Sequence, residues 1–205
     1  MDITLIPTQY KGAKTGASTF EETATRHDAI LLFEKAKDRL LDVNRWQKLC
    51  GDEGAEFALT DEDGTEVNKH AAVGDLIRIK LPAPPNPEGD GYDWVRVEEF
   101  ENKKDMLKDM EVFGFRVRPV QSPFERDPEA AHFYTSSATS TFLVMRISSI
   151  VTALERGRNE VPNDKPFALI SKLRNWLVAV AAWLGLSKSQ WTKLVKGFIK
   201  GPPQD

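Results

Sequence analysis

The sequence predicts an α+β fold, in which an antiparallel sheet of five to seven strands follows an N-terminal pair of helices and precedes a helical C-terminus. The main observation is a change of hydrophobic period. Apolar residues recur at helical spacing near both ends of the chain, and they alternate with a period of two over residues 56–156. Most turns between the alternating segments are too short for the crossovers that parallel strands need, so the sheet is expected to be antiparallel.

The composition is that of one globular domain spanning residues 1–205. The chain is 40% hydrophobic and 29% charged, and its net charge of −3 gives no global sign of nucleic-acid binding. Its single cysteine, Cys50, cannot form an internal disulfide. The longest apolar run, Trp176–Leu186, is shorter than a membrane span, and the first residues do not resemble a secretory signal. We therefore expect a cytoplasmic protein without a transmembrane segment.

The N-terminal region is expected to contain a short strand and then the first helix. Within a partly flexible segment, 1–17, the stretch Ile3–Pro7 is the expected strand. Two residue pairs have the spacing of a capping box and predict that the helix begins there: Ser18/Glu21 and Thr19/Glu22. The apolar face of this helix follows a helical period: Ala29, Leu32, Phe33, Ala36 and Leu40.

A second short helix, Val43–Leu49, completes the pair, with Asp42 as its expected cap and Gly51 at its end. The strands are expected next, separated by turn signals such as Asp61–Gly64 and Ser148-Ser149. The segments that alternate are Phe57–Leu59, Ile77–Leu81, Tyr92–Phe100, Phe113–Val117, Thr139–Ile147 and Ile150–Arg156.

The C-terminal region combines positive charge with two apolar stripes. Residues 165–200 include seven cations and no acid. The first stripe, Leu169–Leu184, predicts a long helix packed on the sheet. A short extra helix, Ser187–Lys200, belongs to an appended amphipathic segment, 187–205. Its lysines suit an anionic surface, although a helix that packs on a sheet also turns its lysines outward.

The sequence contains no catalytic or metal-binding signature. The histidines lack the spacing of metal ligands, so we expect no metal and no cofactor. His132 and Tyr134 share one side of an extended segment, where they suit a general acid–base pair, although an ordinary surface or half-buried histidine is the favoured interpretation. Arg156 belongs to an Arg-Gly-Arg stretch, which suits recognition of an anion or ion pairs with the acidic body.

The order of these elements resembles that of the helix-grip superfamily, which includes the START lipid-transfer domains, the birch-pollen allergens and the aromatic polyketide cyclases. The resemblance rests on the starting strand Ile3–Pro7, the helix pair through Val43-Asn44-Arg45-Trp46 and the closing stripe Leu169–Leu184. It implies a curved sheet wrapped around the final long helix, with an apolar cavity between them. The residues that the resemblance places at this cavity are Phe113, Phe115, Phe142, Val144, Trp176 and Val180.

The sequence and this resemblance together favour a protein that binds a small hydrophobic or aromatic molecule in the cavity. Two alternatives remain open. One is a hydrolase- or cyclase-like enzyme that uses His132, Tyr134 or Arg156 in the same cavity. The other is an interaction protein whose terminal helix, Ser187–Lys200, contacts a membrane surface, an acidic partner or a second subunit.

Overall fold

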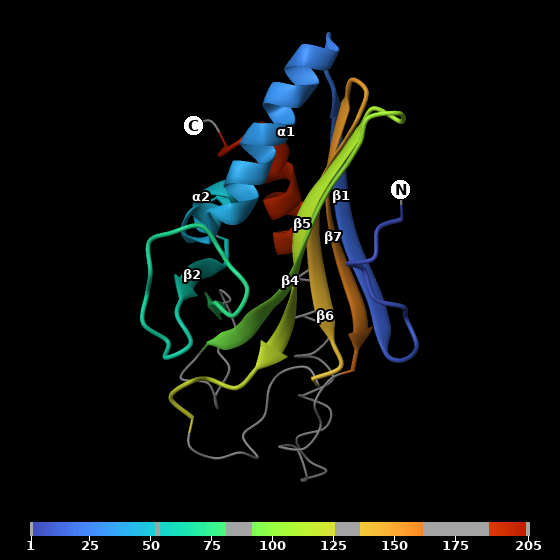
Figure 1. The fold of residues 1–205 in the computed structure, drawn as a ribbon. Coiled ribbons are helices and arrows are strands. Elements are labelled where there is room, and N and C mark those ends of the chain that lie inside the picture. Colours follow the sequence, from blue (N-terminus) through green and yellow to red (C-terminus); the bar gives the residue numbers. More distant parts are fainter. Residues whose placement is uncertain (1, 52–53, 81–91, 126–135, 162–188, 204–205) are drawn as a thin grey trace.

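The computed structural model describes residues 2–51, 54–80, 92–125, 136–161 and 189–203. These residues form one curved sheet with helices on one face and the N-terminal segment on the other (Figure 1). The helices are α1 (Arg26–Leu41), the 3-10 turn η1 (Val43–Arg45), α2 (Trp46–Cys50) and a C-terminal helix at 189–200. The strands are β1 (Ala13–Glu22), β2 (Glu56–Thr60), β3 (Leu76–Lys80), β4 (Asp93–Asp105), β5 (Met110–Val120), β6 (Thr139–Ile147) and β7 (Ile150–Glu160).

The seven strands form a single antiparallel sheet in the order β1-β7-β6-β5-β4-β3-β2. Strands β2 to β7 follow one another as neighbours, and β1 adds to the free edge of β7. The predicted hairpin at Ser148-Ser149 is confirmed, with a positive φ of 53° at Ser148. The α+β class and the antiparallel arrangement are therefore confirmed.

The predicted start of the first helix is wrong, because residues 18–22 belong to β1. The backbone groups of these residues pair with β7, so they need no helix cap. Helix α1 begins at Arg26, after Thr25, whose hydroxyl accepts a hydrogen bond of 3.1 Å from the Asp28 amide. The predicted buried face is confirmed for Ala29, Phe33, Ala36 and Leu40.

The stretch Ile3–Pro7 is not the first strand of the sheet, contrary to the prediction. It crosses the convex face, where Leu5 is fully buried. The Leu5 amide donates to Oε2 of Glu101 at 2.9 Å, and Arg116 donates to the Leu5 carbonyl at 3.2 Å. Leu5 packs in a small second core with Val112, Leu143 and Leu154. Within the segment 1–17, Leu5 thus lies in a core, and β1 begins at Ala13.

The C-terminal helix packs between α1 and the sheet (Figure 1). Leu194, Val195 and Phe198 are fully buried in the main core, which confirms the predicted apolar stripe of this helix. Gly201, with a φ of 83°, ends the helix as expected, and its amide donates to the Gly197 carbonyl at 2.8 Å. The helix expected at Leu169–Leu184 lies outside the described residues.

The centre of the core is Trp46 of α2. Its ring lies 5.0 to 6.1 Å, centroid to centroid, from four phenylalanine rings contributed by β2, β5, β6 and the C-terminal helix: Phe57, Phe115, Phe142 and Phe198. Its indole N–H donates to the carbonyls of residues 39 and 40, at 3.2 Å each. None of the helices in the described part of the chain is long and apolar enough to cross a membrane.

Candidate functional site

The concave face of the sheet holds the apolar residues that the sequence places at the cavity. Phe113, Phe115, Phe142 and Val144 are all buried in the main core, on adjacent strands β5 and β6. Phe115 pairs with Phe142, and Phe113 pairs with Val144, so their side chains share one face. The structure therefore brings together this part of the predicted set.

Of the other predicted site residues, the described structure includes Arg156. His132, Tyr134, Trp176 and Val180 lie outside the described residues. Arg156 lies on the convex face, because it follows Glu155 in β7 and successive side chains of a strand alternate. Its Nη1 donates to the carbonyls of Ala17 and Glu155, at 2.9 and 2.8 Å.

The most unusual residue of the concave face is Glu155 of β7. It is fully buried, and its register partners are Phe142 on β6 and Ala17 on β1, both members of the main core. Neither carboxyl oxygen has a hydrogen-bond partner in the described structure. The Ser140 side chain is close enough to lower the pKa of Glu155 slightly, but it does not reach hydrogen-bond geometry to either oxygen. Since buried polar groups are nearly always paired, Glu155 requires an explanation.

A second buried carboxyl, Glu160, lies toward the end of the same strand. Its Oε1 accepts a 3.0 Å hydrogen bond from the hydroxyl of half-buried Thr15, and its Oε2 has no partner in the described structure. Asn159 has a φ of 56°, which interrupts the regular alternation before Glu160. Gly157 supplies the space, because a Cβ there would collide with the Thr15 hydroxyl and the Glu160 carboxyl. The carboxyl pair therefore depends on this local backbone.

Both carboxyls hold their protons more tightly than exposed glutamates do. Burial, and then repulsion from Glu160, raise the pKa of Glu155 to about 8, although Arg156 and Arg158 act in the opposite direction. Burial also raises the pKa of Glu160, and the hydrogen bond from Thr15 opposes this shift. A carboxyl that titrates near neutral pH, inside an apolar core, is typical of a functional position.

The other end of the concave face shows how this fold satisfies a buried charge. Arg146, with a side chain only 1% exposed, donates to Glu111 at 2.8 Å, to Asp109 at 2.8 Å and to the Ser148 carbonyl at 2.9 Å. Arg26, at the start of α1, donates both Nε and Nη2 to Asp109. Every member of this Arg146 network is paired. In contrast, both oxygens of Glu155 and Oε2 of Glu160 have no hydrogen-bond partner in the described structure.

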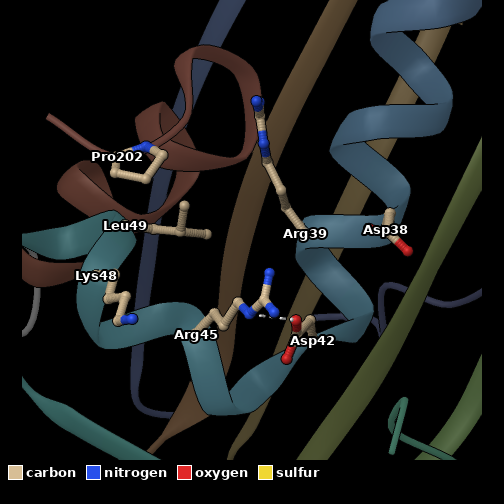
Figure 2. Close-up of a pocket in the computed structure, with 7 residues that line it drawn as sticks. All are labelled: Asp38, Arg39, Asp42, Arg45, Lys48, Leu49 and Pro202. Atoms are coloured by element: carbon tan, nitrogen blue, oxygen red, sulfur yellow. Dashed lines mark ion pairs between the residues drawn. The ribbon is translucent and has the colours of Figure 1, made fainter. Parts of the chain in front are cut away.

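A separate hollow of about 270 Å³ lies where α1, α2 and the C-terminus meet (Figure 2). Its walls are formed by Asp38, Arg39, Asp42, Arg45, Lys48, Leu49 and Pro202. Most of its charged groups already have partners. Arg45 pairs with Asp42 at 3.2 Å, and Arg39 donates to the carbonyls of Phe198 and Ile199 at 2.9 Å each. This hollow is therefore explained as the junction that caps the C-terminal helix.

The described residues hold no cluster of three or more histidine, cysteine or acidic side chains that could bind a metal ion. Cys50 is buried, and burial raises the pKa of its thiol to about 12, so it is not an activated nucleophile. The two glutamates are thus the strongest chemical feature of the described concave face.

Comparisons with known proteins give the fold and little else. No protein-family model matches the sequence, and no curated protein matches it. A hypothetical protein from Helicobacter pylori has a solved structure that matches with a TM-score of 0.50 at 14% identity, over 95% of this chain and 98% of that one. The chain has the helix-grip fold. This assignment rests on the order of elements: one strand, a helix pair, six antiparallel strands and a C-terminal helix on the sheet.

Plant members of the helix-grip fold match at lower TM-scores. Norcoclaurine synthase from Thalictrum flavum matches at 0.36 with 11% identity, over 96% of this chain and 100% of that one. A major latex-like protein from Panax ginseng matches at 0.32 with 10% identity, over 86% of this chain and 99% of that one. At this similarity the helix-grip likeness concerns the fold alone, so function has to be argued from this chain's own residues.

Proposed function

We propose that this helix-grip protein binds a small, mainly apolar molecule between its sheet and its C-terminal helix, with the polar group of that molecule at Glu155. The observation that carries the proposal is the unpaired carboxyl of Glu155 within an aromatic core. An unsatisfied buried polar group typically costs about 1–3 kcal/mol, and more when it is charged. A bound molecule that supplies a hydrogen-bond donor removes this cost.

The surroundings of Glu155 support an apolar ligand. Its neighbour Phe142 contacts Trp191 of the C-terminal helix, with ring centroids 5.4 Å apart. Small-molecule sites in proteins are mostly apolar and aromatic, with a few polar groups that fix the orientation of the ligand. Phe113, Phe115 and Val144 extend this apolar surface along β5 and β6.

The experiment uses native mass spectrometry of the full-length protein and calorimetric titration with a neutral aromatic probe, 2-naphthylmethanol. We expect a co-purified small molecule or saturable binding of one probe per chain. The variant Ala153→Leu, on the concave face, should weaken probe binding by about tenfold or more, because it fills part of the interior. Val73→Leu is the matched control, since Val73 is 63% exposed. The absence of both a co-purified molecule and saturable probe binding in the wild-type protein would contradict the proposal.

A second candidate function is acid–base catalysis in the same interior. It is favoured by one observation: a pKa of about 8 leaves Glu155 mostly protonated at neutral pH, as a general acid must be. Of the residues expected to share this role, Arg156 lies on the opposite face of β7, and His132 and Tyr134 lie outside the described residues. We therefore place binding first.

A further candidate function is contact with a membrane surface or a second subunit through the terminal helix, Ser187–Lys200. The apolar face of this helix is buried in the core, so only its polar side, with Lys193 and Lys196 exposed, is available to a membrane or a second subunit. A polar face without apolar anchors supports only weak membrane binding.

A further inference from the structure

We infer that the Glu155–Glu160 pair is a binding site for the protonated amino group of an apolar organic amine. This inference rests on the proposed function and names the class of its ligand.

Once its proton is released, the Glu155 carboxylate provides acceptors and no donors, which a bound cation can satisfy. Both oxygens of Glu155 and Oε2 of Glu160 are buried and unpaired in the described structure. A neutral alcohol offers one hydrogen, whereas a primary ammonium offers three and adds charge attraction in a medium of low dielectric constant. The repulsion between the two carboxyls, which contributes to the raised pKa of Glu155, is relieved when a cation lies beside them.

A metal ion fits this site less well than an organic cation. Calcium takes six to eight oxygen ligands, and magnesium about six. The described residues offer no third acidic, histidine or cysteine side chain to complete such a set. An organic ammonium, in contrast, suits the aromatic neighbour Phe142, the register partner of Glu155, because the faces of aromatic rings attract such cations.

The charges that act on Glu155 are few. Glu160 lies on the same strand. Arg156 and Arg158 follow Glu155 along β7, with their side chains on the convex face. The neighbouring strands contribute no charge at this point. The residues nearest in register are Ala17 and Thr15 of β1 and Ser140 and Phe142 of β6. The two arginines donate to backbone carbonyls, so neither of them pairs with the carboxyl of Glu155.

The test compares two probes of nearly the same shape, 2-naphthylmethylamine and 2-naphthylmethanol, by calorimetric titration of the full-length protein at pH 7. We expect the amine to bind about ten- to a hundredfold more tightly than the alcohol, as a charged hydrogen bond predicts. Binding of the amine should also release a proton from Glu155, detected as a dependence of the measured heat on the buffer used. Amine affinity should rise between pH 6 and 8.

The variant Glu155→Gln should reduce amine affinity about tenfold or more and abolish proton release, while the affinity of the alcohol stays within about twofold. Glu155→Leu is a second variant, chosen because a leucine side chain suits the apolar surroundings of this buried position. Glu22→Gln is the matched control, because Glu22 is exposed at the end of β1. It should leave both affinities unchanged.

Distinct outcomes separate this inference from the proposed function. If the alcohol binds but the amine binds no more tightly, or if the preference for the amine survives in Glu155→Gln, the ammonium site is wrong and the binding function stands. If calcium alone binds with proton release and displaces the amine, the site is a metal site and the inference is overturned. If neither probe saturates the wild-type protein and no small molecule co-purifies with it, the proposed function itself fails.

Discussion

The carboxyl of Glu155 makes stability depend on pH in an unusual direction. Because its pKa is raised to about 8, the folded protein binds this proton more tightly than the unfolded chain does. The contribution of Glu155 to stability is therefore largest at low pH and is lost as pH rises from the ordinary carboxyl range to about 8. Most carboxylates that are paired in a native structure have the opposite effect.

We predict that Glu155→Gln removes this dependence. Between pH 5 and 8, the free energy of unfolding of the wild-type protein should fall relative to that of the variant by about 1.4 kcal/mol for each pH unit. Urea unfolding at several pH values measures the difference. Glu22→Gln should follow the wild-type curve. A constant difference between wild type and Glu155→Gln across this range would show that the carboxyl titrates normally.

The Arg146 network predicts a loss of stability of a different kind. Replacing Arg146 by methionine leaves Glu111, whose side chain is only 11% exposed, without its main partner. We expect a cost of about 2–4 kcal/mol in urea unfolding at pH 7, because a buried charge has lost its counter-charge. The double variant Arg146→Met/Glu111→Met should recover part of that loss. Additive losses in the double variant would contradict this explanation.

The same network weakens in acid. Hydrogen bonds from Arg26 and Arg146 hold the pKa of Asp109 well below its usual range. Bonds from Arg146 and Lys104 lower the pKa of Glu111 despite its burial. Their stabilisation is present above the ordinary carboxyl pKa and is lost as pH falls below it, so this end of the sheet and the Glu155 end respond to pH with opposite signs.

At the residue scale, alternation in the sequence located inward-facing apolar residues but not the two buried carboxyls. Phe142 and Val144 alternate on a strand and are buried as predicted. Glu155 follows Val151 and Ala153 on the same alternating face, which was a usable signal that an acid faces the core. The residue predicted as a site residue in this stretch was instead its neighbour Arg156, which lies on the opposite face of β7. Glu160 gave no such signal, because its orientation depends on the backbone at Asn159.

At the scale of elements, the C-terminal helix packs closely against α2 at Gly197. A Cβ at Gly197 would lie 2.6 Å from Cβ of Leu49 and 2.8 Å from its carbonyl oxygen. We predict that Gly197→Ala costs about 1–3 kcal/mol in urea unfolding, even though alanine favours a helix by about 1 kcal/mol over glycine.

The matched control for this prediction is Lys196→Ala, one residue earlier on the exposed side of the same helix. It should change the free energy of unfolding by less than about 0.5 kcal/mol. A stabilised Gly197→Ala protein would mean that the two helices pack less closely than the structure indicates.

The elements themselves were predictable where a local pattern decides them. Alternation over 56–156 identified strands β2 to β7 but not β1, and helical spacing identified the buried faces of α1 and of the C-terminal helix. The start of α1 was not predictable from capping-box spacing, since Ser18 and Glu21 satisfy their backbone groups by pairing with β7. That strand lies more than a hundred residues away, and no local pattern contains it.

At the scale of the whole molecule, the sheet is covered on both faces. Helices cover the concave face, and the N-terminal segment covers part of the convex face (Figure 1). We predict that Leu5→Ala costs about 2–4 kcal/mol in urea unfolding, the range for a fully buried leucine. Leu107→Ala is the control, because Leu107 is fully exposed in the β4–β5 turn. Equal stability of the two variants would show that the N-terminal segment does not pack on the sheet in solution.

The most direct test of the proposed binding site is the ionisation of Glu155 itself, followed by carbon-13 NMR of labelled glutamate carboxyls. The signal is assigned by its loss in Glu155→Gln. We expect Glu155 to titrate at about pH 8 in the free protein and at a clearly lower pH when the protein is saturated with 2-naphthylmethylamine. A Glu155 that titrates like an exposed glutamate, or that titrates unchanged in the presence of the amine, would contradict the account.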